Sequence, residues 1–156
     1  MNIYRQPPES EVRRLLAESD LPTSDLTLEH LSHFFGCGST QKPKGVVGLE
    51  IYGSVALLRS LAVAEKKRRR GCGKALVAEA ERYAQACGVE RLYLLTTTAE
   101  KFFERLGYKH AVREAAPEPI RRTHEFSGLC PSSSAFMVKE LPANPSLNHV
   151  STLVVV

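Results

Sequence analysis

The chain has 156 residues, with 21 Lys and Arg against 17 Asp and Glu, a formal net charge of +4. This length suggests one domain with a real core, because a ~150-residue domain buries roughly 70% of its unfolded surface. Hydrophobic residues at 43% and charged residues at 24% exclude disorder of the whole chain. The excess charge lies in five consecutive basic residues, 66–70. This concentration argues against a broad nucleic-acid face and for a local anion site.

The first half of the chain predicts two short helices and an antiparallel meander. Residues 3–5 favour a short strand, and Ser10 is predicted as the N-cap of a helix that ends near Ser19. A second short helix is expected over 26–31. Alternating apolar residues and turn residues then predict three strands of an antiparallel meander, over 33–37, 46–52 and 55–63.

The second half begins as a strand, turn, helix and strand. A helical period starts at Gly73 and ends before Gly88, and a buried strand follows over 89–95. The two strands of such a βαβ unit lie parallel. Later elements are expected as a helix over 99–106, a strand over 108–112, a helical patch over 117–126 and a strand over 134–138. The fold class is therefore mixed α/β with a mostly antiparallel sheet.

The cysteines and apolar runs favour a cytoplasmic protein that has no membrane span. The four cysteines form no Cys-x-x-Cys pair, the first residues do not resemble a secretory signal, and no apolar stretch approaches the ~20 residues of a membrane span. Reduced thiols are expected. His30, His33 and Cys37 lack a fourth ligand at suitable spacing, so no metal is predicted.

The most informative segment is 68–74, Arg-Arg-Arg-Gly-Cys-Gly-Lys, between a strand and a helix. Helix N-termini leave backbone N–H groups unpaired and carry partial positive charge, and glycines let that backbone approach an anion. The expected ligand is a phosphate or pyrophosphate. Ala75 breaks the P-loop pattern, and Leu76 breaks the Rossmann pattern. A solvated turn and a nucleic-acid patch stay open on this segment alone.

Three segments together resemble the GNAT family, the Gcn5-related N-acetyltransferases. Arg68 to Gly73 matches the Gln/Arg-x-x-Gly-x-Gly/Ala motif, residues 57–63 resemble the fourth strand, and residues 102–108 resemble the aromatic-Tyr-Glu-x-Leu-Gly segment. The match covers roughly residues 2–141. It implies the GNAT fold, in which parallel strands four and five splay apart to make a slot for acetyl-CoA. It also implies acetyl transfer to the primary amine of a small molecule.

The resemblance also implies the organisation of the chain and its partners. Residues 1–141 are expected to form the acetyltransferase domain. Residues 142–156 form a tail that docks on the sheet, pairs with a second subunit or is disordered. Nucleic acid and membrane are not expected as partners. A homodimer is one expectation, because dimers are common in the family and the end of the tail is apolar.

The family's binding pattern implies roles on both sides of the slot. Backbone amides of the glycine turn bind the CoA pyrophosphate, main-chain groups ending the fourth strand bind pantetheine, and the Leu61 amide polarises the thioester carbonyl. Phe103 stands where many members have a tyrosine that protonates the leaving thiolate, which motivates the alternative of a non-catalytic acyl-CoA sensor. The expected cofactor-binding residues are Leu61, Ala62, Val63, Arg68, Arg69, Arg70, Gly71, Cys72, Gly73, Lys74, Thr97 and Phe102.

Polar and charged residues of the predicted strands are candidates for binding the amine that accepts the acetyl group. Glu50 is either the base that takes the proton of the amine or an exposed strand carboxylate. A buried Arg59 needs an anionic partner, which is either Glu50 or an acidic substrate headgroup. Thr96, at the end of a strand, is a third substrate-binding candidate. The motifs, with Leu-Cys-Pro at 129–131, resemble GNAT proteins of bacterial arsenic-resistance operons, which implies an amino-acid-like arsenical or phosphinic acceptor.

Overall fold

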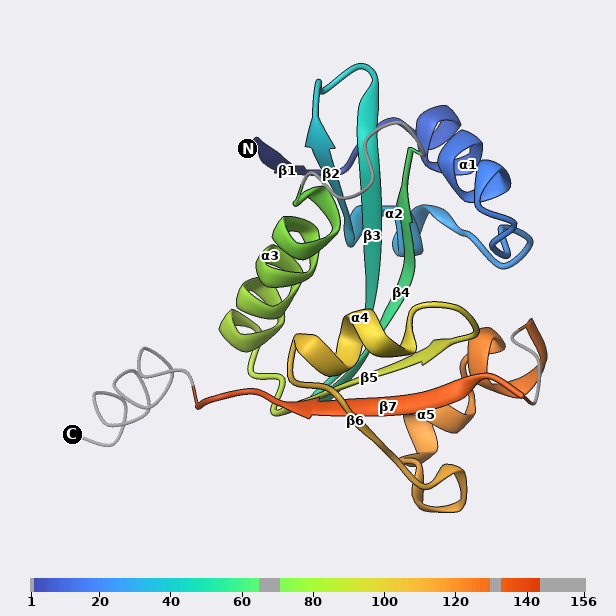
Figure 1. The fold of residues 1–156 in the computed structure, drawn as a ribbon, viewed down its shortest axis with the longest axis vertical. Helices are drawn as coiled ribbons and strands as arrows, with labels where there is room; N and C mark the ends of the chain where they lie inside the picture. The colour runs from blue at the N-terminus through green and yellow to red at the C-terminus, as the bar shows by residue number, and fades with distance from the viewer. Residues whose placement is uncertain (1, 65–70, 130–132, 144–156) are drawn as a thin grey trace.

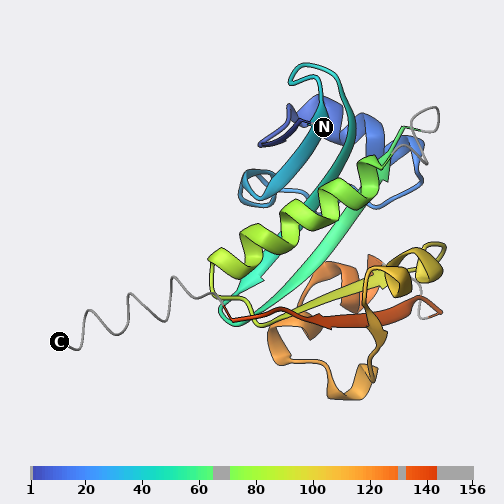
Figure 2. The same ribbon diagram turned by 60° about the vertical axis from the view of Figure 1, so that its left-hand side comes forward.

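The computed structural model describes residues 2–64, 71–129 and 133–143. Its centre is a seven-stranded mixed sheet with the strand order β1-β2-β3-β4-β5-β7-β6. Helices cover both faces of this sheet (Figures 1 and 2). Only the β4–β5 pair is parallel among the described strands, so the expected mixed, mostly antiparallel sheet is confirmed.

The first half of the chain forms the predicted meander. Its elements are β1 (Ile3–Arg5), α1 (Glu9–Glu18), α2 (Leu28–Ser32), β2 (Phe34–Gly38), β3 (Pro43–Tyr52) and β4 (Val55–Val63). The N-cap of α1 is Pro8, and no side chain caps the helix, so the predicted Ser10 cap is wrong. The fixed φ of a proline suits the first turn of a helix. Ser10 lies one residue inside that turn.

The second half forms the predicted βαβ unit and a closing hairpin. Its elements are α3 (Cys72–Ala86), β5 (Arg91–Thr96), α4 (Glu100–Arg105), β6 (Lys109–His110), η2 (Arg113–Ala115), α5 (Glu118–Arg121), η3 (Glu125–Leu129) and β7 (Ala135–Glu140). The strand predicted over 108–112 shortens to β6, which pairs with β7 alone. The helical patch over 117–126 divides because the Thr123 hydroxyl donates to Ile120 O and accepts from Phe126 N.

The core lies in two layers, one on each face of the sheet. On one face α3 and α4 bury Leu76, Val77 and Phe103 against the strands. On the other face α1 packs over β3 and β4, and α5 packs over β4 and β5. Among the described residues, no helix is both long enough and apolar enough to cross a bilayer.

The strands β4 and β5 diverge halfway along their length. Their parallel pairing covers only Val55↔Arg91 to Leu57↔Tyr93, although both strands continue. On the other side of β4, a register shift places Ser60 and Leu61 opposite the single residue Val47. Such a β-bulge bends a strand and leaves one residue outside the ladder. The strand therefore turns away from β5, as Figure 1 shows.

Candidate functional site

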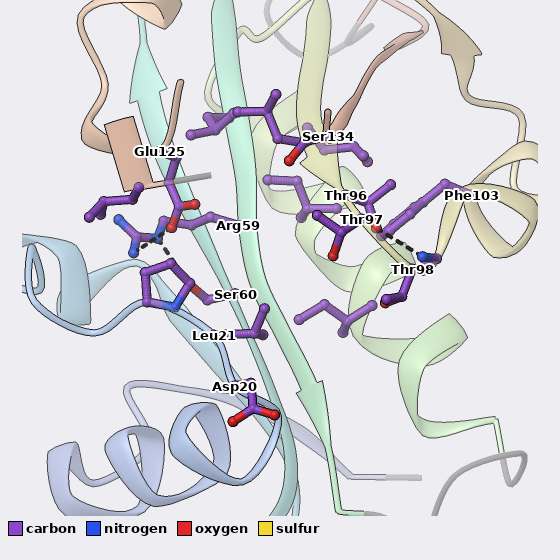
Figure 3. Close-up of a pocket in the computed structure, with 18 residues that line it drawn as sticks. Asp20, Leu21, Arg59, Ser60, Thr96, Thr97, Thr98, Phe103, Glu125 and Ser134 are labelled. Atoms are coloured by element: carbon purple, nitrogen blue, oxygen red, sulfur yellow. Dashed lines mark hydrogen bonds and ion pairs between the residues drawn. The ribbon is translucent and has the colours of Figure 1, made fainter. Parts of the chain in front are cut away.

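A cavity of about 360 Å³ occupies the space between the diverging ends of β4 and β5 (Figure 3). It exists because the ladder between the two strands stops after three residue pairs. The lining residues are 20–22 after α1, 57–61 of β4, 94–99 at the end of β5, Phe103, Glu125, Leu129 and Ser134. Of the sequence candidates, Arg59, Leu61, Thr96 and Thr97 reach this cavity.

The first turn of α3 presents its backbone without a side-chain cap. The N-cap is Gly71, with φ +82° in the left-handed region that favours glycine. A Cβ at this position would meet no atom within 4 Å, so the conformation, not space, requires glycine. Because the first N–H groups of a helix have no intrahelical partner, this turn offers donors to an anion.

The end of β4 runs next to that turn. A Cβ at Gly73 would lie 3.8 Å from Val63 Cγ2 and 3.4 Å from Phe102 Cζ. Two of the predicted cofactor residues therefore flank the helix start, and Lys74 is exposed beside it. Arg68, Arg69 and Arg70 lie outside the described residues.

Cys72, the first residue of α3, is buried against the sheet. Desolvation, and after it the hydrogen bond and charge of Cys37, raises the pKa of the Cys72 thiol to about 12. This thiol is therefore neutral near pH 7 and a weak nucleophile. Only the backbone of Cys72 is available for the role implied by the resemblance.

The side chain of Arg59 is buried, and all five of its N–H groups have acceptors. Nε donates to Ser60 Oγ at 3.0 Å. Nη1 donates to Asp25 and, at 2.9 Å, to Glu50 Oε2. Nη2 donates to Asp25 Oδ1 at 2.8 Å and is paired with Glu125 Oε1 at 2.8 Å. The ion pair with Glu50 is thus formed, and no N–H is left for an acidic headgroup.

Three buried carboxylates consequently share one guanidinium. Desolvation opposes the charge on Arg59, but the Asp25 hydrogen bonds and the Glu125 charge raise its pKa overall. Burial likewise pushes the pKa of Asp25 upward, yet Arg59 more than offsets this and holds it below the usual range. The charge of the cluster is −2 when every carboxylate is ionised. His30 Nε2 lies 3.7 Å from Glu50 Oε1, and its protonation would add one positive charge.

The two glutamates of this cluster differ in their access to the cavity. Glu50 is buried beside Arg59 and accepts a hydrogen bond from the Tyr52 hydroxyl, but it does not line the cavity. Glu125, which the sequence analysis did not select, does line it. Its place in a helical patch gave no signal of burial, because the patch changes from α5 to the π-helical η3 just before it.

Hydroxyl groups line the other wall of the cavity. Thr96 Oγ1 accepts the Ala99 N–H at 3.0 Å, and Thr97 is exposed at the end of β5. Ser134, which the sequence analysis also missed, lies next to β7 and is only 5% exposed. Among the described residues, its hydroxyl is the one buried side-chain oxygen that has no hydrogen-bond partner. Figure 3 shows this hydroxyl directed into the cavity.

Aromatic rings close the cavity beside β5. Phe103 packs edge to face against Phe102 and Tyr108, at ring-centroid distances of 5.0 Å and 5.4 Å. Tyr108 does not line the cavity, because its hydroxyl donates to Glu81 Oε2 on α3 at 2.8 Å. Burial and the charge of Glu81 raise the pKa of Tyr108. No tyrosine hydroxyl therefore reaches the cavity from the described residues.

Two parallel strands splay apart over a cavity, and a helix N-terminus without a side-chain cap lies beside them. This is the arrangement expected above for a cofactor-binding fold with a slot between strands four and five. The model of the Acetyltransferase (GNAT) family matches residues 1–108, so the chain belongs to this family. The predicted GNAT fold is confirmed.

Two sequence relatives and one solved structure agree with this assignment. An uncharacterized N-acetyltransferase of Chlorobaculum tepidum is 35% identical over 61% of this chain and 61% of that protein. An amino-acid acetyltransferase of Ralstonia nicotianae is 33% identical over 73% of this chain and 23% of that protein. The N-acetylglutamate synthase of Neisseria gonorrhoeae, complexed with coenzyme A and N-acetyl-glutamate, has a TM-score of 0.74 at 20% identity, over 90% of this chain and 35% of that one. The matched segment thus spans less than two thirds of each relative.

Proposed function

We propose that this chain is an acetyl-CoA-dependent N-acetyltransferase that acts on the primary amine of a small molecule. The observation that carries the proposal is that β4 leads from the cavity, through its bulge, to the uncapped start of α3. Family membership and the coenzyme A bound to the Neisseria synthase support it.

The cofactor would lie along this path. The amides of residues 71–74 and the exposed Lys74 side chain bind the pyrophosphate at the positive end of α3. The main chain of residues 61–63 binds pantetheine, with Phe102 beside the turn. Arg68, Arg69 and Arg70 would add positive charge, as the motif implies. The acetyl group then enters the cavity near Leu61 and Thr97.

The reaction requires one proton acceptor and stabilisation of one developing negative charge. The amine nitrogen forms a bond to the thioester carbon, the C–S bond breaks, and the amine loses its proton. The Leu61 amide, at the β-bulge, stabilises the oxyanion. Glu125 accepts the proton because its carboxylate lines the cavity. Glu50, the candidate from the sequence, becomes a positioning residue that holds Arg59 and through it Glu125.

The departing CoA thiolate must gain a proton. Phe103 cannot provide one, and the Tyr108 hydroxyl is turned toward Glu81. Water or a threonine hydroxyl at the end of β5 takes this role, which a thiolate leaving group tolerates. The same Phe103 motivates the second candidate, a sensor that binds acetyl-CoA without turning it over.

A finer hypothesis concerns the acceptor. The resemblance to proteins of arsenic-resistance operons implies an acidic, amino-acid-like arsenical or phosphinic compound, held by Arg59. Every N–H of Arg59 already has an acceptor. No described cation in the cavity is therefore left to bind the acidic group of such a compound. We therefore propose only that the acceptor is a primary amine, and we include amino-acid-like arsenicals among the amines to be assayed.

A thiol-release assay over a panel of amines tests the proposal. Amino acids, aminoglycosides, polyamines, peptides and amino-acid-like arsenicals are each mixed with acetyl-CoA. Release of CoA that depends on one class of amine supports the enzyme. Saturable acetyl-CoA binding without release from any amine would favour the sensor. Salt-sensitive DNA binding that acetyl-CoA does not displace would favour a nucleic-acid module instead.

Two further expectations stay predictions. A homodimer is testable by light scattering, and a cytoplasmic location by fractionation of cells that express the chain.

A further inference from the structure

Among the described residues, the charged side chains that line the cavity are Asp20, Arg59 and Glu125. The charge of Arg59 is more than matched by the three carboxylates around it. Asp20 follows α1, is exposed, and makes no ion pair with a described residue. Figure 3 shows Asp20 and Glu125 at separate places on the wall. The described lining therefore carries an excess of negative charge.

This excess is costly to leave uncompensated. Buried carboxylates without partners are strongly unfavourable, and one guanidinium cannot neutralise three. Protonation of His30 would supply one positive charge beside Glu50, which still leaves the cluster negative. A cation in the cavity, next to Glu125, would lower the remaining electrostatic cost.

A second observation points to a ligand with N–H groups. Ser134 is only 5% exposed and lines the same cavity, and its buried hydroxyl has no partner in the described part of the chain. Buried polar groups in folded proteins are nearly always hydrogen-bonded. Thr96 lies close to it, since Ala135 of β7, the residue after Ser134, pairs with Thr96. An ammonium group suits this wall, because it donates three hydrogen bonds and accepts none.

We propose that the cavity selects an acceptor that carries two positive charges, a diamine or a polyamine. This inference rests on the proposed acetyltransferase function. One ammonium lies between Glu125 and Ser134 and first loses one proton to Glu125. The resulting amine attacks the acetyl carbon, and its second proton passes through water or a threonine hydroxyl to the departing thiolate. The second ammonium lies toward Asp20. The bond that forms joins nitrogen to the acetyl carbon, and the bond that breaks joins that carbon to the sulfur of CoA.

Three four-carbon probes isolate the effect of the second charge. Putrescine ends in a second ammonium, butylamine ends in a methyl group, and γ-aminobutyrate ends in a carboxylate. The full chain is assayed for thiol release with saturating acetyl-CoA, and kcat/KM is compared across the probes. We expect putrescine to exceed butylamine by about tenfold, and γ-aminobutyrate to be the poorest probe. The advantage of putrescine should shrink as salt is added.

Variants assign that advantage to particular carboxylates. Asp20→Asn removes one charge at a position where φ is +55°, a conformation that asparagine tolerates well. It should reduce the ratio of putrescine to butylamine to about threefold. Glu125→Gln should lower kcat for both amines. Glu118→Gln is the control, because Glu118 is exposed, pairs with Arg122 and does not line the cavity. It should leave the ratio unchanged.

Calorimetric titration of the same probes into the CoA complex separates this inference from the proposed function. Tighter binding of putrescine than of γ-aminobutyrate, with no turnover of any amine, would support a cavity that selects cations while the proposed function fails. Ser134→Ala should weaken putrescine binding without changing the salt dependence. The inference would be overturned if the three probes had equal kcat/KM and bound equally, or if γ-aminobutyrate were preferred. It would also be overturned if none of the probes bound.

Discussion

Replacing Arg59 with methionine tests how much the buried cluster contributes to stability. Methionine keeps an unbranched side chain but removes every N–H that the three carboxylates accept. The side chain of Arg59 is 1% exposed, so water cannot replace those bonds. Removing one partner of a buried ion pair costs roughly 3–5 kcal/mol, and we expect a loss in this range for Arg59→Met near pH 7.

A matched substitution on the surface provides the control. Arg82 pairs with Glu79 on α3, and its side chain is 72% exposed. An exposed pair contributes about 0.2–1 kcal/mol, so Arg82→Met should be nearly neutral. Urea unfolding followed by circular dichroism measures both variants against the parent chain. Losses that agree within about 1 kcal/mol would refute the assignment of a structural role to Arg59.

The pH dependence of the stability loss in Arg59→Met is a separate test of the same reasoning. The pKa of Asp25 is lowered in the folded chain, where burial raises it but Arg59 offsets this. A group with a depressed folded pKa contributes stability above its unfolded pKa of about 3.9, and this contribution is lost as pH falls through the folded pKa. Without Arg59 the carboxylates are protonated more readily. The deficit of Arg59→Met should therefore shrink as pH falls from about 7 through the lowered pKa of Asp25, below about 3.9. A deficit that grows over this range would contradict the reasoning.

Three further predictions concern the cofactor turn and the aromatic wall. Gly71→Val should raise the Kd for acetyl-CoA at least about tenfold, whereas Gly53→Val, with φ +66° and equally open surroundings, should leave it unchanged in the same titration. Tyr108→Phe removes the bond to Glu81 and should lower the free energy of unfolding by about 1.5–3 kcal/mol, while an altered kcat would argue against its position outside the cavity. Phe103→Tyr places a phenol at the cavity wall and should raise kcat by roughly tenfold or more; a fall in kcat with unchanged thermal unfolding would count against it.

Local pattern predicted the elements that build the site. The strand over 55–63 was correct at both ends, because Gly53 and Ser54 turn the chain before it. The helix α3 followed from its apolar period, and Gly88 ends it with φ +90°. The splay of β4 and β5 came from the family resemblance alone, since periodicity gives no information on where a parallel ladder stops.

The partners of Arg59 show what the sequence could not supply. Burial of a charge within an apolar strand predicted that a partner exists, and the neighbouring strand offered Glu50. Asp25 and Glu125 come from a loop before α2 and from η3, far along the chain on either side. Only the tertiary packing of α1 and α5 over β4 brings these segments together. The same packing decides that Glu125, and not Glu50, lines the cavity.

A single extra residue in β4 links the two halves of the site. Before the bulge, Ala56 and Leu58 pack on the face of α3; after it, Leu61 and Val63 take that face. Without the insertion, strict alternation would turn Leu61 and Val63 to the face that holds Arg59. The bulge therefore brings the end of β4 next to the start of α3 while the Ser60 hydroxyl remains on Arg59 Nε. The site proposed for an anionic cofactor therefore lies on one face of the strand and the carboxylate cluster on the other because of this one irregularity.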